Sequence, residues 1–351
     1  GIQQVIFSAT HTHSAPYMEL DLPHVAPIHA AIVETLREAA DKLQPARIGV
    51  GSATIDISHN RRLIKDGVCY MLWRNEARKA TSPIDHEAAL LRIDTADGQP
   101  LATLVHYACH PVIFGPDNKK YSADWPGEMC ARVKETTGAE CFFLQGGAGD
   151  INPYVDKTPL AEGGERLMRE EGAKAADAVL AAYRSIETMA PDHPALAYRE
   201  DWVDVGTRWD MQDPGQAKIL QEAYTRMYDF YMQPFAKDPR VPVGVLLLNN
   251  QIAFPCLPGE FFVQFQIDMK LRSPLPHTFL CGYTNEFHIY FPTIKDAAIG
   301  GYGASTATYV GIGAGEKVVN HALVMLGEMT GQFRPLRGPE DFELNELPTE
   351  T

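Results

Sequence analysis

The chain is expected to fold as one α/β domain over residues 1–351, for two reasons. Predicted strands and helices alternate through the first half and again from Val241 onward, which is the pattern of α/β folds. The 351 residues are 45% hydrophobic and 22% charged, which is ordinary for a globular protein. This length slightly exceeds the roughly 250–300 residues at which a single core stops growing, so two closely packed halves would also fit.

The first predicted element is a strand over residues 5–9, which are mostly apolar. Earlier strands of its sheet are then expected to belong to residues that precede Gly1. No signal peptide is visible. A helix is predicted over 28–43, where apolar residues recur on one helical face. Strands follow over 46–57.

The next strands end at turns. One strand is predicted over 88–94, and a β-rich stretch over 101–112 ends at a proline. A short buried strand over 141–144 runs into the glycine-rich turn 146–149. An alanine-rich amphipathic helix is predicted over 168–186.

The middle of the chain, residues 187–240, is richer in Asp, Pro, Tyr and Met and is expected to be an insertion or lid. Within it, 216–235 has a helical pattern. The tail 335–351 is acidic and is expected to lie on the surface. The remaining predicted elements are strands over 243–248, 252–256 and 278–282 and helices over 259–271 and 318–329.

The composition limits the possible partners. The formal net charge of −14 repels phosphate backbones, so nucleic acid is not an expected partner. The longest strongly apolar run, Val243–Leu248, is far shorter than the roughly 20 residues that span a bilayer, so no integral membrane segment is expected. The six cysteines form no CxxC pair and are expected as buried free thiols or as one or two disulfides. The oligomeric state is not predicted.

A pair of histidines at the end of the first predicted strand is the strongest sign of a site. His11 and His13 are two residues apart, so both side chains point to the same side of a strand. The pair predicts a metal site, and a structural pair is the alternative.

A second pair of histidines lies in the stretch His106–Pro111. His110, beside the proline, is expected at the rim of a sheet. His106 is expected to be hydrogen-bonded in the core or to support a ligand.

Two further segments carry candidate oxygen ligands. Glu260 follows a Pro-Gly turn at the start of a predicted helix, where the helix dipole alone would favour an acidic residue. Tyr290 and Tyr302 lie in the glycine-rich stretch 282–305, where tyrosines usually pack and make one hydrogen bond.

These segments share one property: each lies at a strand end or in the loop after one, where ligands bind in open α/β sheets. A set of His, Glu and Tyr side chains is suitable as ligands for Zn²⁺. Zinc lowers the pKa of a bound water from 15.7 to about 7 and so supports hydrolysis at neutral pH. No phosphate-binding loop, dinucleotide fingerprint, GxSxG elbow or kinase signature is present.

The motifs around these residues resemble those of the neutral/alkaline, non-lysosomal ceramidases. They occur in family order over nearly the whole chain: SATHTHSAP at 8–16, HNRR at 59–62, HYACHPV at 106–112, SADWPGE at 122–128, QGGAGDINP at 145–153, PGEF at 258–261, and YFPT to YGAST at 290–306. Tyr290 and Tyr302 are 12 residues apart, as are the two functional tyrosines of the family. The resemblance implies a zinc-dependent catalytic N-terminal domain in which two mixed β-sheets pack against helices.

The resemblance also implies roles for individual residues. The implied zinc ligands are His11, His110, Glu260 and Tyr290. The residues implied to surround the scissile carbonyl are His13, Arg61 and Tyr302. The implied reaction is hydrolysis of the amide of N-acylsphingosine to a fatty acid and a sphingoid base, in sphingolipid metabolism, by a secreted or periplasmic enzyme.

Asn152 departs from the family, which has a serine after this Gly-Asp-Ile sequence. An asparagine cannot form an acyl-enzyme, so Asn152 is expected to orient the substrate or to hold the turn 146–149. Asp124 and Asp150 are expected either to orient a ligand histidine or to cap local structure. Two alternative functions stay open: a zinc hydrolase of another amide, an ester or a lactone, and an inactive, zinc-stabilised binding protein.

Overall fold

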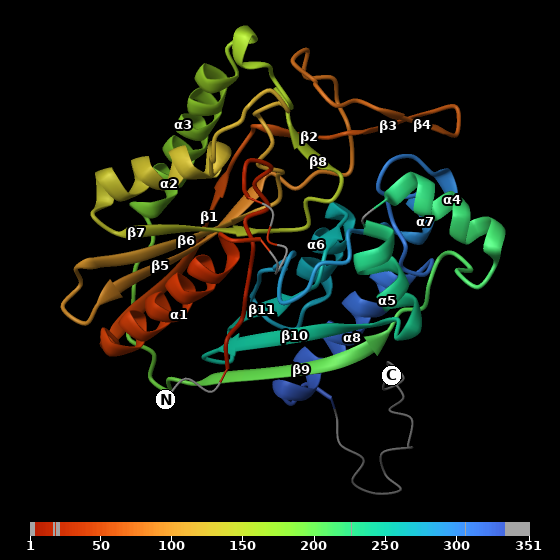
Figure 1. The fold of residues 1–351 in the computed structure, drawn as a ribbon. Helices are drawn as coiled ribbons and strands as arrows, with labels where there is room; N and C mark the ends of the chain where they lie inside the picture. The colour runs from red at the N-terminus through yellow and green to blue at the C-terminus, as the bar shows by residue number, and fades with distance from the viewer. Residues whose placement is uncertain (1–3, 17, 19–21, 226, 306, 334–351) are drawn as a thin grey trace, which may run out of the picture.

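The computed structural model describes residues 4–16, 18, 22–225, 227–305 and 307–333. Its centre consists of two mixed four-stranded sheets (Figure 1). The first has the order β1 (Ala46–Thr54), β5 (Glu87–Thr95), β6 (Pro100–Tyr107) and β7 (Glu140–Gln145). The second has the order β13 (His277–Thr278), β11 (Ile252–Cys256), β10 (Arg240–Leu248) and β9 (Leu196–Asp204). The predicted α/β class is therefore confirmed, as is the pair of mixed sheets.

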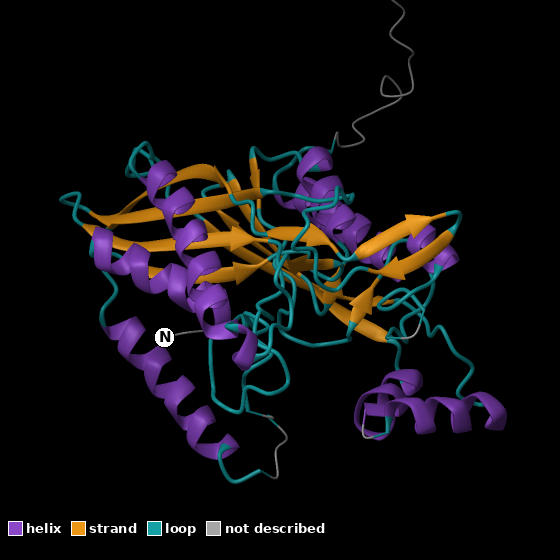
Figure 2. Ribbon diagram, turned by 90° about the horizontal axis from the view of Figure 1, so that it is seen from above, coloured by secondary structure: helices purple, strands orange, loops and turns teal. Residues whose placement is uncertain are grey.

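Helices cover the outer faces of the two sheets, which gives four layers (Figure 2). Helices α2 (Asp124–Thr137) and α3 (Gly164–Tyr183) pack on the first sheet, around a core that includes Trp125. Helices α6 (Val263–Arg272) and α8 (Ala314–Met329) belong to the core of the second sheet. A smaller apolar cluster, with members such as Leu91 and Phe254, joins the facing sides of the two sheets.

Short strands at one end of the sheets position the site. The pairs are β2 (Ser58–Asn60) with β8 (Ile151–Pro153), β12 (Glu260–Phe261) with β14 (Tyr290–Phe291), and β3 (Arg62–Lys65) with β4 (Val68–Met71). The remaining helices are α1 (Val25–Asp41), α4 (Pro214–Tyr224), α5 (Gln233–Lys237) and α7 (Ile294–Ile299), a 3₁₀ turn over Leu160–Glu162 and a π-helical turn over Tyr228–Met232. None of the helices in the described part of the chain is long and apolar enough to cross a membrane.

The predicted strand over 5–9 is wrong. This segment makes only a single bridge, between Ser8 and Thr284, and hydrogen bonds such as that from the Ala9 amide to the Tyr283 carbonyl, at 3.1 Å. Phe7 is 52% exposed, so the apolar residues do not mark a core strand. Residues 5–9 therefore give no sign of earlier strands in the same sheet.

Two other predictions need correction. The helix expected over 259–271 begins only at Val263, because Glu260 belongs to the short strand β12. The expected insertion over 187–240 contains β9, which pairs with β10 along its whole length. The role of 187–240 as an insertion or lid stays a prediction; its helices α4 and α5 lie where 216–235 was expected to be helical. The tail 335–351 lies outside the described residues, and all six cysteines are free.

Candidate functional site

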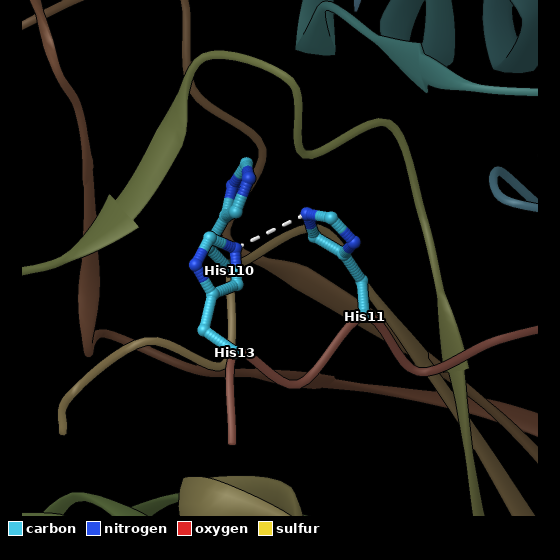
Figure 3. Close-up of side chains that lie close together, drawn as sticks. All are labelled: His11, His13 and His110. Atoms are coloured by element: carbon cyan, nitrogen blue, oxygen red, sulfur yellow. Dashed lines mark hydrogen bonds between the residues drawn. The ribbon is translucent and has the colours of Figure 1, made fainter. Parts of the chain in front are cut away.

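Three imidazoles from two distant segments of the chain meet near the end of the first sheet (Figure 3). His11 and His13 lie in the loop after residue 9, and His110 follows β6. One nitrogen of each ring lies within 4.8 Å of the others. The rings of His11 and His13 lie together, as expected, but in a loop rather than at a strand end, and His11 has a left-handed backbone with φ of 65°.

The His110 ring is fixed by the chain around it. Its Nδ1 lies 3.0 Å from the carbonyl oxygen of Ile151, which can only accept a hydrogen bond, so Nδ1 carries the proton. Its Nε2 then presents a lone pair in the neutral ring and lies 3.1 Å from Oε2 of Glu260. The Trp125 indole donates to the His110 carbonyl at 3.1 Å. Metal-binding histidines typically have one ring nitrogen protonated and hydrogen-bonded, as Nδ1 is here, and the other nitrogen free to bind the metal.

Glu260 connects the imidazoles to the tyrosines. It is buried, and it pairs with Tyr290 in the register of the parallel strands β12 and β14. Its Oε2 also lies 3.5 Å from Nε2 of His11 and accepts a hydrogen bond from the Tyr283 hydroxyl at 3.4 Å. Burial alone would raise the pKa of Glu260, but His11 and His110 hold it well below its usual value.

Two imidazoles of the cluster, those of His13 and His110, favour the neutral form. Desolvation by the protein around its ring, followed by the charges of the neighbouring histidines, lowers the pKa of His13 from 6.5 to about 3, although the residue reaches solvent at the edge of the cluster. Burial also lowers the pKa of His110, to about 4, although the neighbouring Glu260 carboxylate favours the protonated ring and opposes this shift. Neutral imidazole is the form that binds a metal, so His13 and His110 are in a ligating state at neutral pH.

Arg61 lies beside this cluster in an aromatic enclosure. It is 3% exposed, and its guanidinium carbon lies 5.2, 5.4 and 5.3 Å from the ring centres of Trp73, Tyr290 and Tyr302. It donates to the carbonyl oxygen of Gly149 at 2.6 Å. Burial alone would lower the pKa of Arg61. The interaction with Tyr290, through charge and a hydrogen bond, outweighs burial, and the pKa is raised above its usual value. The residue therefore places a permanent positive charge next to Tyr290.

Asn152 uses both ends of its amide. Its Oδ1 accepts a hydrogen bond from Arg61 at 3.2 Å, and its Nδ2 donates to Asp156 at 2.9 Å. The side chain is fully buried, on β8. Asn152 thus positions Arg61, which is a function that sequence reasoning did not assign to it.

The two tyrosines occupy different depths. Tyr290 is 4% exposed, whereas Tyr302 is 39% exposed, and their ring centres are 5.4 Å apart. Tyr290 therefore belongs to the interior of the site and Tyr302 to its mouth. The eight residues expected at the site all lie in or around one cluster, and their roles stay predictions.

Three aromatic residues of the site were not predicted. The Tyr283 ring stacks on His11 with centres 4.2 Å apart, and Phe287 lies 6.0 Å from His11. Trp73 stands over Arg61. Tyr283 and Phe287 lie between β13 and Tyr290, so their place in the sequence could have marked them as candidates for the site. No motif marks Trp73.

His106 does not join the cluster. Its Nε2 bonds to the carbonyl oxygen of Leu280 at 2.7 Å, and its ring stacks on Phe279. This confirms it as a hydrogen-bonded core histidine. Asp150 accepts from the Val263 amide at 2.8 Å and thereby orders the start of α6, so it supports local structure.

The donor set fits zinc. It combines imidazole nitrogens with a buried carboxylate oxygen, which is the type of ligand set that this metal takes. His13 is part of the same group, with its Nε2 3.2 Å from that of His11. The geometry therefore admits His13 as a further nitrogen donor as well as a proton carrier.

Comparison with known proteins relates this architecture to ceramidases. No family model and no curated protein matches the sequence. Among solved structures, the neutral ceramidase from Pseudomonas aeruginosa matches with a TM-score of 0.71 and 16% identity over 95% of this chain and 61% of that chain. A ceramidase complexed with C2 matches with a TM-score of 0.70 and 17% identity, over 93% and 62% of the two chains.

These matches concern the fold. The chain spans about three fifths of the length of the solved structures, at 61% and 62%. The chain therefore has the fold of neutral ceramidase, as its motifs predicted, over the part of those proteins that it covers.

Proposed function

We propose that this chain is a zinc-dependent hydrolase of the neutral ceramidase type, which cleaves a linear amide bond. The observation that carries the proposal is the approach of two imidazoles, His11 and His110, to one oxygen of the buried Glu260, at 3.5 and 3.1 Å. The ceramidase fold of the chain supports it.

The proposed zinc ligands are His11, His110, Glu260 and Tyr290. Zinc bound there would supply an electrophile for a carbonyl oxygen and a water acidified to near-neutral pKa. Burial and the Glu260 carboxylate raise the pKa of the Tyr290 phenol well above its usual value, and the positive charge of Arg61 partly opposes that rise.

The other residues would act on the substrate. His13, exposed at the edge of the cluster, would carry a proton between the attacking water and the leaving amine. Nε of Arg61 is buried and has no hydrogen-bond partner among the described residues, so it is a free donor for charge that develops on the carbonyl oxygen. The Tyr302 hydroxyl would be a second donor, at the mouth of the site.

The proposed substrate is an N-acylated sphingoid base or another linear lipid amide. This proposal rests on the solved ceramidases that share the fold, and a secreted or periplasmic location is proposed on the same basis. Asn152 would not form a covalent acyl-enzyme intermediate, because its side-chain amide is not a nucleophile.

The test measures product release from matched N-acyl and O-acyl substrates of several chain lengths, with zinc and after chelation. We expect zinc-dependent release of fatty acid from N-acyl substrates. Preferential cleavage of esters or lactones would favour the alternative hydrolase over an amidase. Zinc binding without any turnover would favour a binding protein.

A pair of neighbouring arginines provides the matched variants. Arg61→Lys should lower kcat about 100-fold, since one well-placed oxyanion donor contributes about 3 kcal/mol. Arg62→Lys should leave kcat within about threefold, because Arg62 packs on Phe262 and pairs with Asp296, neither of which is a proposed ligand or catalytic residue. Equal kcat in both variants would remove Arg61 from the mechanism.

A further inference from the structure

One hollow of the protein, outside the histidine cluster, is walled by aromatic rings. It has a volume of about 330 Å³, and its lining residues come from β9, the helical segment that ends in α5, and the segment around Phe287. Six aromatic residues line it: Trp202, Phe230, Tyr231, Phe235, Phe287 and Tyr309. We refer to this hollow as the aromatic pocket.

The floor and the rim of the aromatic pocket differ. Phe235 and Tyr309 form a buried floor, with ring centres 5.0 Å apart in an edge-to-face arrangement. Trp202, Phe230 and Tyr231 form the rim and are 52%, 60% and 48% exposed. Large rings exposed around a hollow mark a ligand or interaction site more often than a chance arrangement.

Acidic groups share the pocket with the rings. Oε2 of Glu286 lies 2.7 Å from Nε2 of His288, whose Nδ1 lies 3.1 Å from the Tyr309 hydroxyl. Because a carboxylate can only accept, Nε2 of His288 carries the proton and, in the neutral ring, Nδ1 accepts from Tyr309. The Glu286 carboxylate is thus held in place by His288, with 38% of its side chain exposed.

The nearest positive charge is already paired. Arg240 binds both carboxylate oxygens of Asp238, at 2.6 and 2.7 Å. Of the two carboxylates in the lining, Glu286 is therefore the one that no arginine pairs in the described part of the chain. The formal net charge of −14 on the whole chain adds an attraction for cations.

We propose that the aromatic pocket binds an organic ammonium group of the trimethylammonium type, such as the choline group. Ring faces attract such a cation, by about 2 kcal/mol for a desolvated contact, and Glu286 supplies the counter-charge. The Glu286 carboxylate would repel an anion, and it would not attract a neutral apolar ligand.

The aromatic pocket is separated from the histidine cluster by Phe287. This ring lines the pocket and also lies 6.0 Å from His11 and 6.3 Å from Tyr283. None of the pocket-lining rings or carboxylates named above is a proposed zinc ligand. Ammonium binding therefore does not depend on the proposed hydrolytic function and is expected in metal-free protein.

The experiment compares choline with its uncharged isostere 3,3-dimethylbutan-1-ol by isothermal titration calorimetry on the full chain, with and without chelator. We expect choline to bind at least tenfold more tightly than the isostere. Trp202→Leu, which keeps an apolar side chain but removes the ring, should weaken choline binding about tenfold. Glu286→Gln should weaken it about fivefold.

Phe142→Ala is the matched control, because Phe142 is 53% exposed on β7 in the other sheet. It should leave choline binding unchanged, and thermal unfolding should verify that each variant is folded. Equal binding of choline and the isostere, or unchanged binding in folded Trp202→Leu, would overturn the proposal.

Vesicles distinguish the source of the ammonium group. Choline-sensitive sedimentation with phosphatidylcholine vesicles, but not with phosphatidylglycerol vesicles, would support a lipid headgroup as ligand. Choline binding without vesicle binding would support a free solute in the same pocket. The proposal would be contradicted if the protein did not bind choline but still bound vesicles, and choline did not displace them.

Discussion

Replacement of His110 and His106 by alanine separates a metal ligand from a core histidine. The two residues are four positions apart and both are buried. Burial is the main cause that lowers the pKa of each ring from 6.5 to about 4. Both rings also bond to a backbone carbonyl, at 2.7 Å for His106 and 3.0 Å for His110. Their surroundings differ: His110 lies beside Glu260 and the other two imidazoles of the cluster, whereas His106 stacks on Phe279.

The cost to the metal-free protein should therefore be similar. Each variant leaves a buried carbonyl without its partner, which costs about 1–3 kcal/mol. Loss of the stacking between His106 and Phe279 adds about 0.5–1.5 kcal/mol. Both variants should thus unfold at lower denaturant concentration than the wild type in the presence of a chelator.

Zinc should then distinguish them. At a thousandfold excess over its Kd, a ligand stabilises the folded state by about 4 kcal/mol, or about 5 °C in Tm for a chain of this length. We expect this shift in the wild type and in His106→Ala, and little or none in His110→Ala. The assay is thermal unfolding with zinc and with chelator, alongside metal analysis. An equal zinc-induced shift in both variants would refute the assignment of His110.

Three further predictions concern the site. Tyr290→Phe should weaken zinc retention, whereas Tyr302→Phe should keep zinc and mainly lower kcat; equal metal loss in both, by metal analysis, would contradict this division. Asn152→Ser should leave zinc content unchanged, and the wild type should show no acyl-enzyme burst; a trapped acyl adduct would refute the water mechanism. Because folding lowers the pKa of His13 and His110 from 6.5 to about 3 and about 4, the unfolded chain binds more protons below pH 6.5. The metal-free protein should therefore lose stability between pH 6.5 and 4, by on the order of 3 kcal/mol for His110 alone, and a flat unfolding free energy there would contradict these shifts.

The regular elements of the two sheets could be predicted from sequence because their patterns are local. The predicted strand over 252–256 agrees with β11, and that over 88–94 lies within β5. Helix α2 was missed, since its sequence starts with Asp-Trp-Pro-Gly. The β12–β14 pair could not be predicted either, because residues 30 positions apart define it.

The site shows the same limit. The motifs predicted the histidines and Glu260, but not how they are held. The loop conformation of His11, with φ of 65°, depends on the chain around it rather than on a strand. The Arg61–Asn152 hydrogen bond joins residues 91 positions apart, and Trp73 approaches Arg61 without any motif. Such contacts are products of the tertiary fold and leave no local pattern.

The most direct test of the central proposal is a zinc titration of hydrolysis. Metal-free protein is mixed with increasing zinc, and fatty-acid release from an N-acylsphingosine is measured together with bound metal. The proposal predicts no release without metal, and a rate that rises in proportion to bound zinc and levels off at one ion per chain. Full hydrolysis by metal-free protein, or a rate that does not follow bound zinc, would contradict it.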